Sequence, residues 1–179
     1  MSPSPDQIVF EPCRPTQGEA LLVMTWRNDP STLANSFHRA PKSWDNFWPE
    51  FRDTYCMGTP GCQSTPGPVF ALIDGARVGF LRFRPAQPPH GESARCVDIS
   101  INLAPEARGR GLGTAILKAA TGYLGAAGIK TVLAEVRREN ATSLRAFEAA
   151  GYRSLGPAET KIADTGECAK IISFILELG

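Results

Sequence analysis

Apolar and polar side chains alternate with a period of two between residues 95 and 103. Such alternation predicts a strand with one buried face and one polar face. The apolar positions are Val97, Ile99, Ile101 and Leu103, and the polar positions are Asp98, Ser100 and Asn102. Short apolar runs bounded by turn-forming residues predict further strands at residues 8–10, 69–73, 77–84, 131–136, 152–155 and 169–178.

Helices are predicted where the spacing of apolar residues changes to that of a helical face. They cover residues 18–26, a stretch beginning near residue 43, residues 112–125, and a stretch that Asn140 caps and Gly151 ends. Asp74-Gly75 is a strong hairpin turn between two of the strands. The order β-α-α-β-β-β-α-β-α-β-β predicts a mixed α/β fold around one central sheet of six to seven strands, with about four helices. We expect a single domain over residues 1–179.

The composition is that of an ordinary globular domain and excludes several classes of function. The net charge is +1 and there is no basic run, so we expect neither nucleic acid nor a membrane surface as a partner. No apolar run is long enough to span a membrane, and the first residues lack the pattern of a signal peptide. We therefore expect a cytoplasmic protein.

The five cysteines and two histidines do not have the spacing of a metal site. No C-x-x-C pair occurs, so we expect no zinc and no other metal cofactor. The odd number of cysteines argues against a complete disulfide framework and favours free thiols in a reducing cytosol. Cys56 and Cys62 are close enough in sequence to pair, but two unpaired thiols is the favoured interpretation.

The sharpest feature is a glycine-rich turn between a predicted strand and a predicted helix, Arg108-Gly109-Arg110-Gly111-Leu112-Gly113. Such a turn exposes successive backbone N–H groups at a helix N-terminus, where the helix dipole adds partial positive charge. Glycines let a phosphate approach the backbone, and Arg108 and Arg110 add charge. The pattern predicts a pyrophosphate ligand, and it fits neither a Walker A loop nor the G-x-G-x-x-G fingerprint. The alternative is a helix start whose glycines serve only close packing.

Residues 98–152 resemble the core of the GNAT superfamily of acetyl-CoA-dependent N-acetyltransferases. The family loop has a Gln or Arg, two residues, a Gly, one residue, and a Gly or Ala, which residues 108–113 match. Farther along, the family has an Asn that opens a helix, a Tyr seven residues later, and then Gly-Phe. The corresponding residues here are Asn140, Phe147 and Gly151-Tyr152.

The resemblance implies acetyl-CoA as co-substrate and a GNAT-like, mostly antiparallel sheet. In that sheet the parallel strands at residues 97–103 and 131–136 splay apart, and the pantetheine arm lies in the gap. The cofactor-binding positions that it implies are Ile101, Asn102, Leu103, Arg108, Gly109, Arg110, Gly111, Leu112, Gly113, Thr114, Asn140, Ser143 and Phe147.

The resemblance also implies direct transfer of acetyl to an amine, which must be neutral to attack, so a base is useful. Asp98, on the polar strand face beside the thioester, is the first candidate, and Glu135 on the adjacent strand is the second. For each, a solvated or ion-paired carboxylate is the alternative. The tyrosine that usually assists the leaving thiolate is replaced by Phe147, so water, Ser143 or Tyr152 would substitute.

We expect the N-terminal third to form the acceptor side. Its residues 26–30, 35–37, 43–44 and 48 together are similar to GNAT enzymes that acetylate nucleotide-linked amino sugars, and the start at residues 26–29 also occurs in relatives that modify protein N-termini. An aromatic side chain would stack on a sugar or base, and Arg27 would meet a phosphate. A packed aromatic core and surface decoration are the alternatives. The candidate substrate residues are Trp26, Arg27, Asn28, Phe37 and His38.

We therefore expect an N-acetyltransferase that acts on a primary amine of a small molecule, such as a nucleotide-linked amino sugar. A protein N-terminal or other amine acetyltransferase is a second hypothesis. A non-catalytic acyl-CoA-binding module, favoured by Phe147, is a third. Dimers are common among GNAT relatives, so a homodimer is a further expectation.

Overall fold

The computed structural model describes residues 4–56, 65–89, 95–162 and 165–179, and builds them around a seven-stranded sheet. The strands are β1 (Val9–Pro12), β2 (Val69–Ile73), β3 (Ala76–Pro85), β4 (Cys96–Leu103), β5 (Thr131–Arg137), β6 (Arg153–Lys161) and β7 (Cys168–Glu177). The helices are α1 (Gln17–Arg27), α2 (Pro30–Asn35), α3 (Trp44–Glu50), α4 (Leu112–Ala126) and α5 (Ala141–Ala149). A π-helical turn, Phe51–Tyr55, continues α3. The mixed α/β fold predicted from the sequence is confirmed.

Local sequence signals explain where most elements begin. Asn140 accepts a hydrogen bond from the Ser143 amide at 3.2 Å and caps α5 as predicted. Asp29 accepts from the amides of Ser31 and Thr32, and this cap starts α2, a helix that the predicted element order did not include. The described chain therefore has five α-helices rather than about four.

The sheet has the order β1-β2-β3-β4-β5-β7-β6, and every neighbouring pair is antiparallel except β4 and β5. These two parallel strands pair at only three positions, from Cys96↔Thr131 to Asp98↔Leu133. Beyond them β4 continues beside β3 as far as Leu103, and β5 continues beside β7 as far as Arg137. The predicted splay between the two strands is therefore confirmed.

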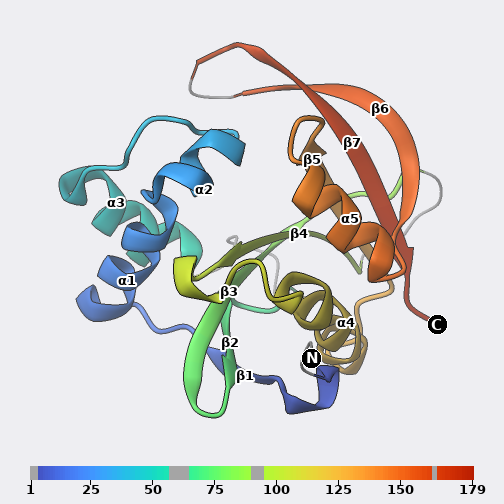
Figure 1. Ribbon diagram of the computed structural model, residues 1–179, viewed down its shortest axis with the longest axis horizontal. Helices are drawn as coiled ribbons and strands as arrows, with labels where there is room; N and C mark the ends of the chain where they lie inside the picture. The colour runs from blue at the N-terminus through green and yellow to red at the C-terminus, as the bar shows by residue number, and fades with distance from the viewer. Residues whose placement is uncertain (1–3, 57–64, 90–94, 163–164) are drawn as a thin grey trace.

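Helices cover both faces of the sheet. Figure 1 shows α1, α2 and α3 grouped on one side, apart from α4 and α5. On the first side Trp26 of α1 meets the Phe70 ring edge-on at 6.1 Å between centroids. On the other side α4 lies so close to β3 that a Cβ added at Gly79 would sit 3.2 Å from Ile116. Glycine at this position therefore allows the helix to approach the sheet.

The cysteines in the described part of the chain form no disulfide. Cys13 and Cys56 bring their Sγ atoms to 4.0 Å, which joins the start of the chain to the π-helical turn. The pairing considered for Cys62 lies outside the described residues. No helix among the described residues is both long enough and apolar enough to cross a membrane.

Candidate functional site

The glycine-rich turn presents a row of unpaired backbone amides at the start of α4. Gly111, which precedes the helix, has φ +73° and Gly109 has φ +72°, values that favour glycine. The first helical hydrogen bond runs from the Ala115 amide to the Gly111 carbonyl at 3.4 Å. Within the described chain, none of the amides of residues 109–114 donates to a protein acceptor. Such a helix start favours an anion.

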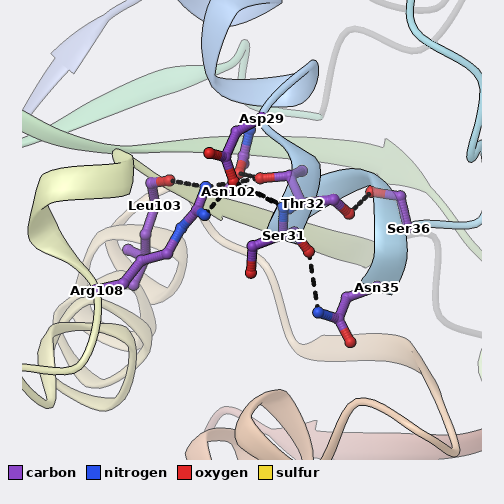
Figure 2. A network of polar contacts seen from close by, with 8 residues as sticks. All are labelled: Asp29, Ser31, Thr32, Asn35, Ser36, Asn102, Leu103 and Arg108. Carbon is purple, nitrogen blue, oxygen red and sulfur yellow. Dashed lines mark hydrogen bonds and ion pairs between the residues drawn. The ribbon is translucent and has the colours of Figure 1, made fainter.

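The Arg108 side chain leaves this turn and reaches the acceptor-side helix α2. Figure 2 shows its guanidinium between the end of β4 and the start of α2. It forms an ion pair with Asp29 and donates to the Thr32 hydroxyl at 2.6 Å and the Leu103 carbonyl at 3.2 Å. The guanidinium holds the pKa of Asp29 below its usual value. Arg108 therefore ties two segments together, and Arg110, which is exposed, is the arginine left to add charge to the turn.

A cavity of about 410 Å³ opens beside the splayed strands. It brings together side chains from α1, the segment after α2, β3, β4, β5 and α5. Ten of the predicted residues line it: Arg27, Phe37, His38, Asp98, Ile101, Asn102, Glu135, Asn140, Ser143 and Phe147. The structure therefore gathers both candidate bases, the start of α5 and part of the acceptor segment in one place.

The other predicted residues lie outside the lining of this cavity. Leu103 and residues 108–114 continue from β4 towards α4. Trp26 is only 3% exposed and packs in the core. The Asn28 amide group is occupied, because it exchanges two 2.8 Å hydrogen bonds with the backbone of Lys42. Trp26 and Asn28 thus have structural partners instead of facing the cavity.

The cavity also contains residues that were not predicted, above all Arg82, Arg84 and Tyr55. Arg82 lies opposite Ser100, and Arg84 lies opposite Asp98, across the antiparallel β3–β4 pair. Residues opposite each other in such a pair share one face of the sheet. The sequence signal for these arginines was their alternation with Leu81 and Phe83. Only the strand register shows that they share a face with Asp98 and Ser100.

Two carboxyl groups with raised pKa values face the cavity. Asp98 is 17% exposed, and desolvation raises its pKa although Arg84 donates to it at 2.7 Å. Desolvation and the neighbouring Asp98 charge also raise the pKa of Glu135, while the Thr160 hydroxyl opposes the change. In the described chain Glu135 has no cationic partner at salt-bridge distance. Glu135 is therefore the better placed of the two to take a proton.

Phe147 of α5 and Tyr152, the residue before β6, form an aromatic contact. Phe147 meets Tyr152 edge-on at 4.9 Å and stacks on Phe174 at 5.7 Å. The Tyr152 hydroxyl is buried and has no hydrogen-bond partner in the described chain, and burial raises its pKa. Tyr152 does not line the cavity.

We predict that Tyr152→Phe stabilises the protein by about 1 kcal/mol, because it removes a buried hydroxyl that lacks a partner. Urea unfolding measures the free energy difference. Tyr123→Phe is the control, since the Tyr123 hydroxyl is not among the buried atoms without a partner. A loss of stability in Tyr152→Phe would mean that the hydroxyl makes a favourable contact.

We predict that Arg108→Met lowers the melting temperature in a pH-dependent way. Asp29 has a depressed pKa, so its stabilising contribution is present above the unfolded value of about 3.9 and is lost as the pH falls through the folded value. The difference from wild type should thus be largest above about pH 4 and shrink below it. Arg110→Met, on the same turn, should show little difference at any pH, and equal effects of both variants would contradict the role of Asp29.

Comparisons with known proteins agree with this geometry. The acetyltransferase (GNAT) family matches residues 26–152. No curated protein matches the chain. In the described residues there is no group of three or more His, Cys, Asp or Glu side chains placed to hold a metal ion.

Several solved acetyltransferases share the fold at low sequence identity. Aminoglycoside acetyltransferase AAC(6′)-Ib with coenzyme A has a TM-score of 0.74 at 14% identity, covering 95% of this chain and 94% of that one. Spermidine N-acetyltransferase from Vibrio cholerae, with CoA and spermine, has 0.74 at 14%, covering 97% and 96%. An N-acetyltransferase from Staphylococcus aureus Mu50 has 0.67 at 18%, covering 96% and 99%. The family match spans most of the chain, which therefore belongs to the acetyltransferase (GNAT) family.

Proposed function

We propose that the protein transfers an acetyl group from acetyl-CoA directly to the primary amine of a small molecule. The observation that carries this proposal is one continuous arrangement along β4. Unpaired amides at the start of α4 lie at one end, and a cavity with two carboxyl groups of raised pKa lies at the other. The cavity volume of about 410 Å³ is suited to a small acceptor.

The residues present fit acetyl-CoA. The amides of residues 109–114 would hold the pyrophosphate, with Arg110 beside them. Among the residues that the structure describes, β4 has no partner on its β5 side beyond Asp98, so its backbone there is available to an extended pantetheine arm. Asn140 and Ser143 would border the thioester end from α5. When bound, acetyl-CoA supplies an activated acyl group on a thiol.

The carboxyl groups would remove the proton that keeps the acceptor amine from attacking. We place Glu135 as the direct proton acceptor, because Asp98 is held by Arg84. The charge on Asp98 helps by raising the pKa of Glu135. This reverses the order in which the two candidates stood on the sequence alone.

The leaving thiolate receives no proton from Phe147, which is an apolar ring in the cavity wall. A thiol pKa of about 8.5 makes the thiolate a tolerable leaving group at neutral pH. The Ser143 hydroxyl, which faces the cavity, or water can donate to it. Most of the rate would then come from holding the amine and the thioester in reacting geometry.

The acceptor itself is not identified by the comparisons. The segment 26–30 suggested a nucleotide-linked amino sugar, but Trp26 is buried and Asn28 is occupied by Lys42. Arg27, Phe37 and His38 do face the cavity. The proposal for the acceptor is therefore a compact primary amine that fits among these three side chains.

We predict that Gly111→Ala weakens acetyl-CoA binding by about tenfold and lowers stability by about 1–2 kcal/mol, because alanine is strained at φ +73°. Gly113→Ala is the matched control: its φ is ordinary, and an added Cβ would meet its nearest neighbours at 3.8 Å. Calorimetry with acetyl-CoA measures binding. Equal affinities for both variants would argue against the turn as the pyrophosphate site.

We predict that Glu135→Gln lowers kcat by about 100-fold in a thiol-release assay with acetyl-CoA and a panel of primary amines. In wild type kcat should rise with pH through the raised pKa of Glu135, since the carboxylate is the active form, and this rise should be lost in the variant. Asp98→Asn should retain the rise but move it to lower pH.

An unchanged pH profile in both carboxyl variants would contradict the assignment of the base. If acetyl-CoA binds by calorimetry but no amine releases thiol, the protein is an acyl-CoA-binding module and not a transferase. If acetyl-CoA does not bind, the proposed function is wrong.

A further inference from the structure

Two arginines that line the cavity have no carboxylate partner among the described residues. Arg82 forms no hydrogen bond or ion pair within the described chain, and its guanidinium carbon lies 3.8 Å from the centroid of the Tyr55 ring. The guanidinium carbon of Arg27 lies 5.9 Å from the same centroid, and its buried Nε has no partner in the described chain. Desolvation is the main cause that lowers the pKa of Arg82, and the charge of Arg27 adds to it. Two unpaired like charges thus lie close together beside one ring.

Two of the three carboxylates in the cavity wall are already engaged with other cations, and in the described chain the third, Glu135, is not within salt-bridge distance of either arginine. Asp98 is paired with Arg84 at 2.7 Å, and Glu50 is paired with Lys42 at 2.5 Å. The cavity wall as a whole has five cationic side chains against three carboxylates. Desolvating a half-buried cation without a partner is costly, so this wall favours a ligand that brings negative charge.

The position of the pair relative to the proposed reaction centre sets the size of that ligand. Arg82 lies opposite Ser100, two residues along β4 from Asp98. Two residues of a strand span roughly 7 Å. An acceptor with its amine near the carboxyl groups would therefore place its far end, a few bonds away, at Arg82.

We propose that Arg27 and Arg82 bind an anionic group, a carboxylate or a phosphate, on the acceptor. The substrate class is then compact amines that carry a negative charge, such as amino acids or aminoalkyl phosphates. This inference rests on the proposed function, because it takes the cavity as the acceptor site. Tyr55 holds the Arg82 guanidinium by stacking, and the π-helical turn places its ring there. Polycationic amines such as spermine are expected to be poor acceptors.

The test compares amines that differ only in the anionic group: β-alanine against β-alaninamide, and phosphoethanolamine against ethanolamine. Binding to the CoA-loaded protein is measured by calorimetry, and turnover by thiol release from acetyl-CoA. We expect the anionic member of at least one pair to bind and react about 10- to 100-fold better, the range for hydrogen bonds to charged groups. The two pairs separate a carboxylate ligand from a phosphate ligand.

Arg82→Met and Arg27→Met should each abolish most of this preference, because they lower binding and turnover of the anionic amines far more than those of the neutral amines, and Arg82→Lys should retain part of it. Arg138→Met is the control, since Arg138 is exposed and does not line the cavity. Circular dichroism checks that each variant is folded. If Arg82→Met does not fold, the test relies on Arg27→Met.

A wild-type preference for the neutral amines or for spermine would overturn the inference while leaving acetyl transfer intact. Equal losses for charged and neutral amines in Arg82→Met would also overturn it, because the arginine would then be structural. If no amine releases thiol, the proposed function fails, and the anion site is judged by calorimetry alone. In that case the anion site is supported if the anionic amine of a pair binds more tightly than its neutral partner and this difference is lost in Arg82→Met. Equal binding of the two amines refutes the anion site.

Discussion

The site depends on one constraint in the sheet, the short pairing between the parallel strands β4 and β5. Three paired positions hold the strands together at their starts, and each strand then follows its antiparallel neighbour on the other side. The strands can therefore diverge without either one leaving the sheet. Where the strands diverge, the backbone N–H and C=O groups that face the gap have no neighbouring strand in the described chain to pair with. Such groups are costly to bury without a hydrogen-bond partner. A bound extended chain in the gap would satisfy them.

The two helices that begin beyond the diverging strands differ in how their first amides are satisfied. At α5 the Asn140 side chain accepts from the Ser143 amide, so that helix start is already capped. At α4 the capping position is Gly111, which has no side chain and leaves the amides open. The Asn cap thus satisfies the start of α5, which borders the cavity. The Gly cap leaves the start of α4 open, and such a start favours an anion.

The elements and the glycine-rich turn could be predicted because their signals are local. Alternation over residues 95–103 and the cap at Asn140 need no knowledge of distant segments. The direction of the Arg108 side chain could not be predicted, because it depends on where α2 packs against β4. The same holds for Arg82, whose place in the cavity follows from the β3–β4 register. A sequence pattern identifies a polar strand face, but only the tertiary arrangement shows what that face meets.

The charges around the cavity act on both partners of the proposed proton transfer. Desolvation and the neighbouring Asp98 charge raise the pKa of Glu135, the proposed proton acceptor. A raised carboxyl pKa makes a better proton acceptor. Cationic surroundings, here Arg27, Arg82 and Arg84, also disfavour a protonated amine and so reduce the cost of removing its proton. An anionic group on the acceptor would lie away from the amine and neutralise part of that positive charge there. This contact would orient the substrate. The charged groups nearest the amine would still disfavour its protonated form.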